Sequence, residues 1–145
     1  MRDSVKDKRE WYDKLPKKGW NYVSSYKYPN INSACDLCNT WMKKEVYLSH
    51  PQIKEHIRVG SDCFETLTSI SITSLESFIN HPKWKRHSEK YFLHYKKKYF
   101  IHIYILGDQF SLTIDDVIGT KPYKTLNEAK FTAFKYIMHK LECKR

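Results

Sequence analysis

Three cysteines and a histidine are spaced as the ligands of one metal ion. Two residues separate Cys35 from Cys38, eleven separate Cys38 from His50, and twelve separate His50 from Cys63, which gives the pattern C-x2-C-x11-H-x12-C. Cysteines two residues apart place both thiolates on one tight turn, where the sulfurs can reach a tetrahedral zinc ion at about 2.3 Å. We therefore predict a structural Zn²⁺ site formed by Cys35, Cys38, His50 and Cys63.

Other interpretations of these residues stay open. His56 competes with His50 for the fourth position, and Cys35 and Cys38 could instead be a redox pair or two buried thiols. A closed set of four ligands leaves no position for water, so we expect a structural metal and no enzyme. No His-x-Glu element precedes Cys35, although nucleobase deaminases need one before their Pro-Cys-x-x-Cys motif. A metal-dependent nuclease that uses His50 or Asp115 is the enzymatic alternative.

The composition of the first residues indicates the cellular compartment in which the protein is expected. Its first ten residues, MRDSVKDKRE, contain no apolar segment of a secretory signal, and no later run approaches the roughly 18 apolar residues of a membrane span. We expect a cytoplasmic protein that has no contact with a membrane. Thiols stay reduced in that compartment, which favours metal binding over disulfides.

The charge of the chain predicts a polyanionic partner. The sequence has 26 Lys and Arg residues against 16 Asp and Glu residues, a formal net charge of +10. Such a field attracts nucleic acid, which we expect as the partner, either DNA or RNA. The alternative is that a lysine-rich composition only keeps the protein in solution. No small-molecule substrate is indicated.

Regular elements are predicted around the cysteines. Aromatic residues at even spacing indicate a strand within residues 19–28, and residues 45–49 and 56–59 are typical of a hairpin across Pro51. Ser61 is expected to cap a helix that carries Cys63 in its first turn and turns Phe64 and Leu67 inward. The positive end of a helix dipole at that point favours a thiolate.

The second half of the sequence predicts a sheet between two helices. Capping boxes at 73–76 and 125–128 predict helix starts, and strands are expected at 91–95, 99–106 and 110–114, with the turn at Gly107-Asp108. This turn would place three apolar pairs on one face: Ile105 opposite Phe110, Ile103 opposite Leu112, and Ile101 opposite Ile114. The last helix would carry an apolar stripe opposite a basic face.

The metal-ligand stretch resembles known zinc modules. The order of knuckle, hairpin and ligand-bearing helix is similar to the treble-clef class, and Cys35-Asp-Leu-Cys38, His50-Pro51 and Val59-Gly60-Ser-Asp-Cys63 resemble small uncharacterised proteins of bacteria and phages. Treble clefs usually take two ligands from the helix, whereas this chain offers one. The resemblance implies a small treble-clef-like zinc module. With the elements predicted for the second half, the expected fold is α+β, in which this module is followed by an antiparallel three-stranded sheet packed by a C-terminal helix.

The C-terminal half resembles a second class of domains. Three strands followed by Pro122-Tyr123-Lys-Thr125-Leu-Asn-Glu128 are similar to the DNA-binding domains of plant ethylene-response factors and to the arm-binding part of phage integrases. In those families the helix covers one sheet face and the other face contacts DNA. Carried onto this chain, the free face would show Phe100, His102 and Tyr104. These three residues could instead form a second core face beneath the zinc module.

Together these features predict a zinc-stabilised nucleic-acid-binding protein, encoded by a phage or mobile element. The expected divisions are a charged arm or helix at 1–18, a zinc module at 19–85 and a sheet-plus-helix domain at 86–145, which could also pack as one domain. Aromatic rings would stack on bases and lysines would neutralise phosphates. The candidate contact residues are Trp84, Lys85, Arg86, Lys96, Lys97, Lys98, Phe100, His102 and Tyr104. A protein-binding inhibitor or adaptor that uses exposed aromatic residues is the alternative from another class.

Overall fold

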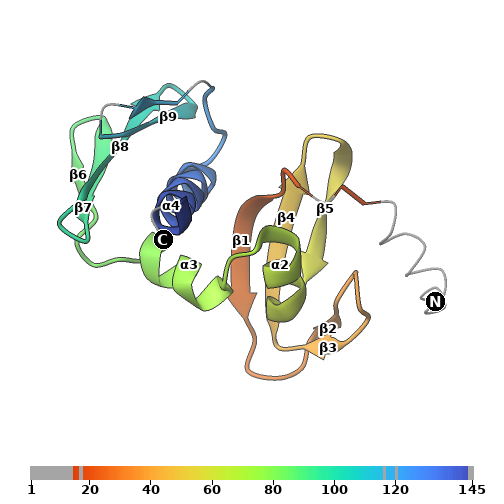
Figure 1. The fold of residues 1–145 in the computed structure, drawn as a ribbon. Helices are drawn as coiled ribbons and strands as arrows, with labels where there is room; N and C mark the ends of the chain where they lie inside the picture. The colour runs from red at the N-terminus through yellow and green to blue at the C-terminus, as the bar shows by residue number, and fades with distance from the viewer. Residues whose placement is uncertain (1–14, 17, 116, 120, 144–145) are drawn as a thin grey trace. The chain divides into compact units, whose positions relative to one another are not determined.

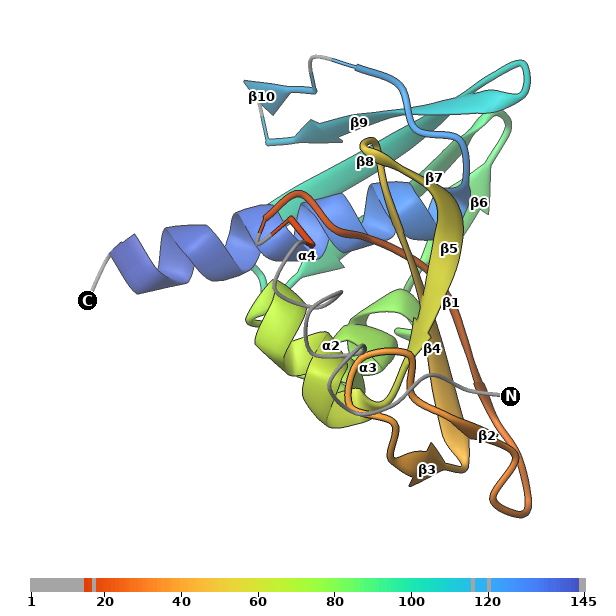
Figure 2. The ribbon, with the colours of Figure 1, turned by 90° about the vertical axis from the view of Figure 1, so that its right-hand side faces the viewer.

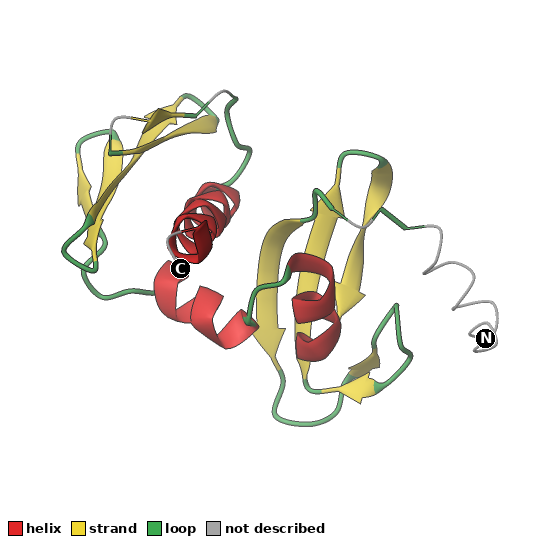
Figure 3. Cartoon of the chain, in the orientation of Figure 1, coloured by secondary structure: helices red, strands yellow, loops and turns green. Residues whose placement is uncertain are grey.

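The chain forms two compact units, each built on an antiparallel sheet. The computed structural model describes residues 15, 16, 18–115, 117–119 and 121–143, and the units comprise Met1–Ile72 and Thr73–Arg145. The predicted arm at 1–18 lies almost entirely outside the described residues. Figure 1 labels the elements, and Figure 3 shows helices and strands in both units, which confirms the predicted α+β class.

A three-stranded sheet forms the frame of the first unit. Its order is β1-β4-β5, where β1 is Asn21–Lys27, β4 is Lys44–His50 and β5 is Ile53–Val59. The predicted aromatic strand and the hairpin across Pro51 are therefore present. Strands β2 (Ser33–Ala34) and β3 (Trp41–Met42), which were not predicted, form a small ribbon between β1 and β4.

Helix α2 covers this sheet. It spans Ser61–Thr68, and its Phe64 and Leu67 are buried, as predicted. The ring of Phe64 meets that of Tyr22 on β1 edge-on, with ring centroids 6.2 Å apart. Val46 and Leu48 of β4 complete the core. Packing of one helix face against the sheet therefore holds α2 in place in this unit.

The second unit contains a larger sheet than predicted. Its five strands run in the order β10-β9-β8-β7-β6. The central strands are β7 (Lys90–Tyr95), β8 (Tyr99–Leu106) and β9 (Gln109–Ile114), which are the three predicted strands. The additional edge strands are β6 (Lys85–His87) and β10 (Val117–Ile118). Both are too short to give a periodic signal in the sequence.

The predicted hairpin register is confirmed. Ile105 pairs with Phe110, Ile103 with Leu112 and Ile101 with Ile114. Gly107 takes the φ of +64° that a tight two-residue turn requires and that glycine adopts without strain. Ile101, Ile103, Leu112 and Ile114 are all buried, so the turn sets which face of the sheet forms the core.

Helix α4 packs against that buried face, as Figure 2 shows. It spans Leu126–Cys143, and its start is capped as predicted, because the Glu128 amide donates to Thr125 Oγ1 at 3.1 Å. The basic face predicted for this helix needs one correction, since Lys130 is buried. Its ammonium group donates to the Ile79 carbonyl at 3.0 Å.

Helix α3, Ile72–Ile79, shifts the division of the chain. It begins before the predicted capping box at Thr73, and its Phe78 packs against Tyr95 of β7 and Phe134 of α4. The two units therefore divide at Ile72 and Thr73, earlier than the predicted boundary at residue 85.

Within the described residues no helix is long and apolar enough to cross a membrane.

Candidate functional site

The first two cysteines lie on the turn between β2 and β3. The turn is closed by two backbone bonds, from the Cys35 amide to the Thr40 carbonyl and from the Asn39 amide to the Cys35 carbonyl, both at 2.9 Å. Asn39 takes a left-handed φ of +63°, a conformation that Asn tolerates better than most residues. The turn thus brings Cys35 and Cys38 to the same side.

Strand β5 holds this turn in place. The Asp36 amide donates to the Arg58 carbonyl and the Arg58 amide donates to Asp36 Oδ2, both at 2.8 Å. The guanidinium group of Arg58 also lies 4.0 Å from Asp36 Oδ1. This reciprocal pairing anchors the cysteine turn beside the end of β5, directly before helix α2.

The third cysteine comes from the first turn of α2. The N-cap is Gly60, with no side-chain cap bond, and Ser61 is the first helical residue, which corrects the predicted capping by Ser61. Cys63 therefore projects from the N-terminal turn, where free amides and the helix dipole favour a negatively charged sulfur.

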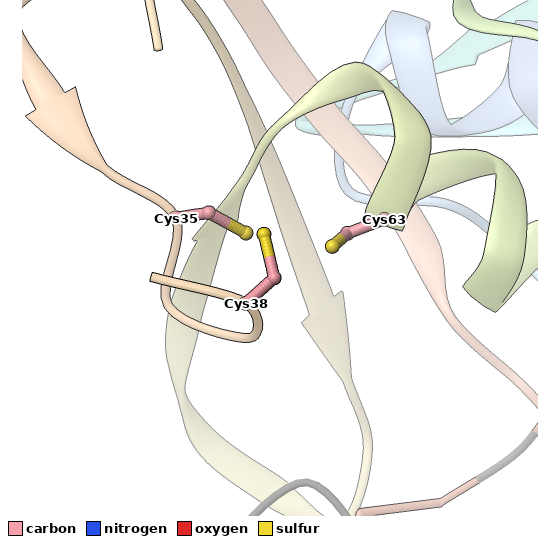
Figure 4. Close-up of side chains that lie close together, drawn as sticks. All are labelled: Cys35, Cys38 and Cys63. Atoms are coloured by element: carbon pink, nitrogen blue, oxygen red, sulfur yellow. The ribbon is translucent and has the colours of Figure 1, made fainter. Parts of the chain in front are cut away.

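The three thiols converge, as Figure 4 shows. The sulfurs of Cys35, Cys38 and Cys63 all lie within 4.8 Å of one another. Sulfurs bound to one tetrahedral zinc ion at about 2.3 Å would be about 3.8 Å apart. The arrangement therefore needs only a small contraction to hold a metal ion.

Hydrogen bonds around Cys35 favour its thiolate form. The pKa of Cys35 is lowered, first by a hydrogen bond from the Cys63 thiol and also by the backbone amides of Cys38, Gly60 and Leu37, and burial opposes this shift. The Leu37 amide lies 3.4 Å from the sulfur. The pKa of Cys63 is raised, because its thiol donates to Cys35. Backbone amides aimed at a sulfur are the surroundings that a metal-bound thiolate requires.

The donor set fits a soft or borderline metal ion. Three thiolates suit Zn²⁺, Cu⁺ or iron in a cluster, and they do not suit Mg²⁺ or Ca²⁺, which prefer oxygen. No family model, curated protein or solved structure matches this chain. The candidate site therefore rests on its own geometry.

The structure does not bring His50 to the thiols. Its Nε2 lies 2.7 Å from the Lys18 carbonyl, and its Nδ1 accepts from the Gln52 amide at 3.1 Å. His50 pairs with Ile53 at one end of the hairpin, whereas Val46 pairs with Val59 at the end where α2 begins. Four residues of β4 span about 14 Å. The residues that converge are therefore the three cysteines, and the predicted ligand His50 is not among them.

The alternative histidine does not complete the set either. His56 lies on β5 with an exposed side chain, and the group of converging ligand atoms contains only the three cysteines among the residues that the structure describes. Within that part of the chain, the fourth position of a tetrahedral metal is thus left to water or to another external ligand.

Replacement of His50 by Gln tests this correction. We expect H50Q to keep the metal content of the wild-type chain and to lose about 1–3 kcal/mol of stability, because a buried ring with two hydrogen bonds is removed. Metal analysis and thermal unfolding of purified protein measure the two effects. C38S, prepared in parallel, is expected to lose metal. Metal loss in a folded H50Q protein would restore His50 as a ligand.

A buried carboxylate that sequence reasoning missed supports the cysteine turn. Glu45 on β4 is 1% exposed and accepts from Ser33 Oγ, from Asn32 Nδ2 at 3.0 Å and from Tyr47 Oη at 2.6 Å. Ser33 and Asn32 lead directly into Cys35, so Glu45 ties this segment to the sheet. No pattern in the sequence predicts this network, because its donors lie up to 13 positions away from Glu45.

The predicted nucleic-acid contacts separate into several groups. Trp84 is turned into the second unit, where its indole donates to the Phe78 carbonyl at 2.8 Å and its ring lies 4.6 Å from Lys130 Nζ. That ring therefore supports the fold and is not displayed for stacking. Lys85 and Arg86 are exposed on edge strand β6, and Arg86 lies over the Tyr91 ring at 5.3 Å.

The three consecutive lysines are displayed on the turn between β7 and β8. Lys96, Lys97 and Lys98 are all exposed, and Lys96 and Lys97 take left-handed φ values of +53° and +55°. Lys96 and Lys98 Nζ each lie 5.5 Å from the ring of a neighbouring tyrosine. The turn therefore concentrates positive charge at one end of the sheet.

Phe100, His102 and Tyr104 share the face of β8 opposite the buried isoleucines. Phe100 is 53% exposed and Tyr104 is 38% exposed, so the alternative of a second core face does not fit these two rings. His102 is partly buried, and burial followed by the charge of Lys90 lowers its pKa. Three of the predicted contact residues are thus brought together on one surface.

Proposed function

We propose that the chain is a metal-stabilised nucleic-acid-binding protein. In this proposal Cys35, Cys38 and Cys63 hold a structural Zn²⁺ ion, and the second unit carries the nucleic-acid contacts. Zinc is the choice among soft metals because it needs no redox chemistry and is commonly bound by cysteine thiolates, and an external ligand would fill the fourth position that the described residues leave open. The support for the metal is the convergence of the three sulfurs within 4.8 Å.

The observation that carries the nucleic-acid part is the uneven charge. Residues 73–145 contain 14 Lys and Arg residues against 7 Asp and Glu residues, whereas residues 1–72 contain 12 against 9. The net charge is therefore +7 in the second unit and +3 in the first, and the second unit also displays Lys96, Lys97 and Lys98 on one turn. Phosphate neutralisation by such lysines supplies the sequence-independent part of binding.

A salt titration tests this proposal. We expect the wild-type chain to bind nucleic acid, with an affinity that falls steeply between about 50 and 200 mM salt. Replacement of Lys96, Lys97 and Lys98 by Gln is expected to weaken binding and to reduce the salt slope by up to about 3.

The matched control removes the same charge from the first unit. Lys27, Lys43 and Lys54 are exposed there, and their replacement by Gln is expected to leave affinity nearly unchanged. Equal weakening by both triple variants would mean that net charge alone, and not the lysine turn, accounts for binding. Failure of the wild-type chain to bind any of single-stranded DNA, duplex DNA or structured RNA at low salt would contradict the proposal.

A protein-binding adaptor is the second candidate, because the first unit also exposes large apolar residues. Tyr26 is 58%, Ile31 61% and Trp41 65% exposed, and Trp41 belongs to the ribbon that carries the cysteines. Exposed aromatic residues of this kind anchor protein interfaces. The nuclease alternative has no such support, since His50 and Asp115 are both bonded to backbone groups.

A further inference from the structure

One face of the second sheet carries rings where an ordinary sheet carries polar residues. An antiparallel sheet with a helix on one side usually alternates apolar residues inward with polar residues outward. The outward positions of β7 and β8 here hold five aromatic or imidazole rings, which we call the ring face: Phe92, His94, Phe100, His102 and Tyr104.

Strand register brings these rings together. His94 pairs with Phe100 and Phe92 pairs with His102 across the two strands. The rings of His94 and Phe100 are stacked, with centroids 3.9 Å apart and an interplanar angle of 10°. Phe92 and His102 meet edge-on at 6.3 Å. The ring face therefore consists of rings in contact across the two strands, and not of scattered exposed residues.

Except for Asp115 at its edge, which lies opposite Phe100, the charges on this surface are positive or absent. Lys90 Nζ lies 5.6 Å from the Phe92 ring and 5.8 Å from the Tyr104 ring. The neighbouring strands add Lys85 on β6 and the neutral Ser111 and Thr113 on β9, whose register places them on this face. The outward positions of β6 to β9, all of which the structure describes, hold no carboxylate. Asp115, just beyond β9, accepts the Phe100 amide through Oδ1 at 2.9 Å.

We propose that the ring face is a stacking platform for the bases of single-stranded nucleic acid. This inference rests on the proposed nucleic-acid-binding function and names the strand form and the surface. Phe100 and Tyr104 are four residues apart on β8, about 14 Å, and sheets that bind RNA stack two or three bases on comparable aromatic positions.

The chemistry of the ring face favours single strands over duplexes. A duplex buries the faces of its bases, so exposed rings have nothing to stack on, whereas unpaired bases offer a π-face whatever their sequence. Lys90, between two rings, is placed to meet the phosphates that connect stacked bases. No arginine lies at the outward positions of β6 to β9, so base-edge readout of guanine is not expected there.

Substitutions at Phe100 separate stacking from general apolar contact. F100Y keeps a ring and F100L keeps only apolar bulk, and the 53% exposure of Phe100 means that neither should disturb the core. We expect F100L to weaken binding of an oligothymidylate of about 12 nucleotides by about 10-fold. F100Y, which keeps a ring, is expected to bind it like the wild type. I118A, on a 72% exposed residue of β10, is the control and should bind like the wild type.

The second comparison changes the ligand. An abasic strand of the same length keeps the phosphates and removes the bases, so the wild-type chain should bind it more than about 10-fold more weakly, and in F100L this preference should shrink by about 10-fold. Equal binding of the abasic strand and oligothymidylate, or equal binding by F100L and the wild type, would overturn the platform while leaving phosphate binding intact. Absence of binding to every strand would instead contradict the proposed function itself.

Discussion

The C63S chain is expected to lose its metal and the fold of its first unit. A structural zinc ion contributes about 10–16 kcal/mol to folding in small zinc-dependent peptides, which is as large as the roughly 5–15 kcal/mol of total stability of an ordinary domain. The ribbon of β2 and β3 has only two residues in each strand, so we expect its contacts with Arg58 and Glu45 to be insufficient to hold it in place without the metal. Hydrogen exchange measured by mass spectrometry would show rapid exchange in β1, β4 and β5.

The second unit provides the internal control for that experiment. It has its own core, which includes Ile101, Ile103 and Phe131, and it contains none of the three converging cysteines. We expect β8 and α4 to stay protected from exchange in C63S. C143S removes a cysteine from α4 and should leave both the metal content and the exchange pattern unchanged. Wild-type protection of β4 in a metal-free C63S chain would contradict a structural role for the metal.

The E45A chain is expected to be destabilised by about 2–3 kcal/mol at neutral pH, because hydroxyl and amide donors are left buried without their acceptor. Burial raises the pKa of Glu45, and hydrogen bonds from Ser33, Tyr47 and Asn32 outweigh it, so that the pKa lies below the ordinary value of 4.5. A lowered pKa means that the carboxylate contributes stability above pH 4.5, which is lost as the pH falls. Urea unfolding at pH 7 measures the loss.

Glu55 offers a matched control for Glu45. It lies on the neighbouring strand β5 with an exposed side chain, so E55A removes the same charge without burying any unpaired group. Its stability is expected to change by less than about 0.5 kcal/mol. A similar loss in both variants would mean that net charge, and not the buried network, accounts for the effect of E45A.

The sequence predicted the elements whose pattern is local. The hairpin at Gly107 fixed its own register, because the turn length and the alternation of isoleucines agree on a single pairing. The capping box at Thr125 correctly predicted the start of α4, because its signal also lies within a few adjacent residues. Strands β6 and β10 were missed, since two or three residues carry no periodic pattern and their pairing depends on the neighbouring strand.

The candidate metal site was predicted in part. The spacing of Cys35 and Cys38 and the helix start near Cys63 are local signals, and the structure brings these three residues together. His50 stands at a plausible spacing, but its position along β4 puts it at the other end of the hairpin from α2. The number of residues between His50 and the cysteines therefore did not show at which end of the hairpin His50 lies.

Burial also separated residues that look alike in sequence. Trp84 and Lys130 have the composition of a nucleic-acid contact and a basic helix face, yet they pack on each other within the second unit. Phe100 and Tyr104, equally aromatic, are exposed because β8 turns its even-numbered residues away from the core. Alternation along β8 had indicated the outer face for Phe100 and Tyr104, whereas the contact between Trp84 and Lys130 joins residues far apart in the sequence, so no local pattern predicts it.

X-ray absorption at the zinc edge of the purified wild-type chain tests the central claim most directly. The three-cysteine centre predicts about one zinc per chain, with three sulfur neighbours at about 2.3 Å, one lighter neighbour, and no outer-shell scattering from an imidazole ring. A folded chain without zinc, or a zinc ion that has a histidine ring among its neighbours, would contradict it.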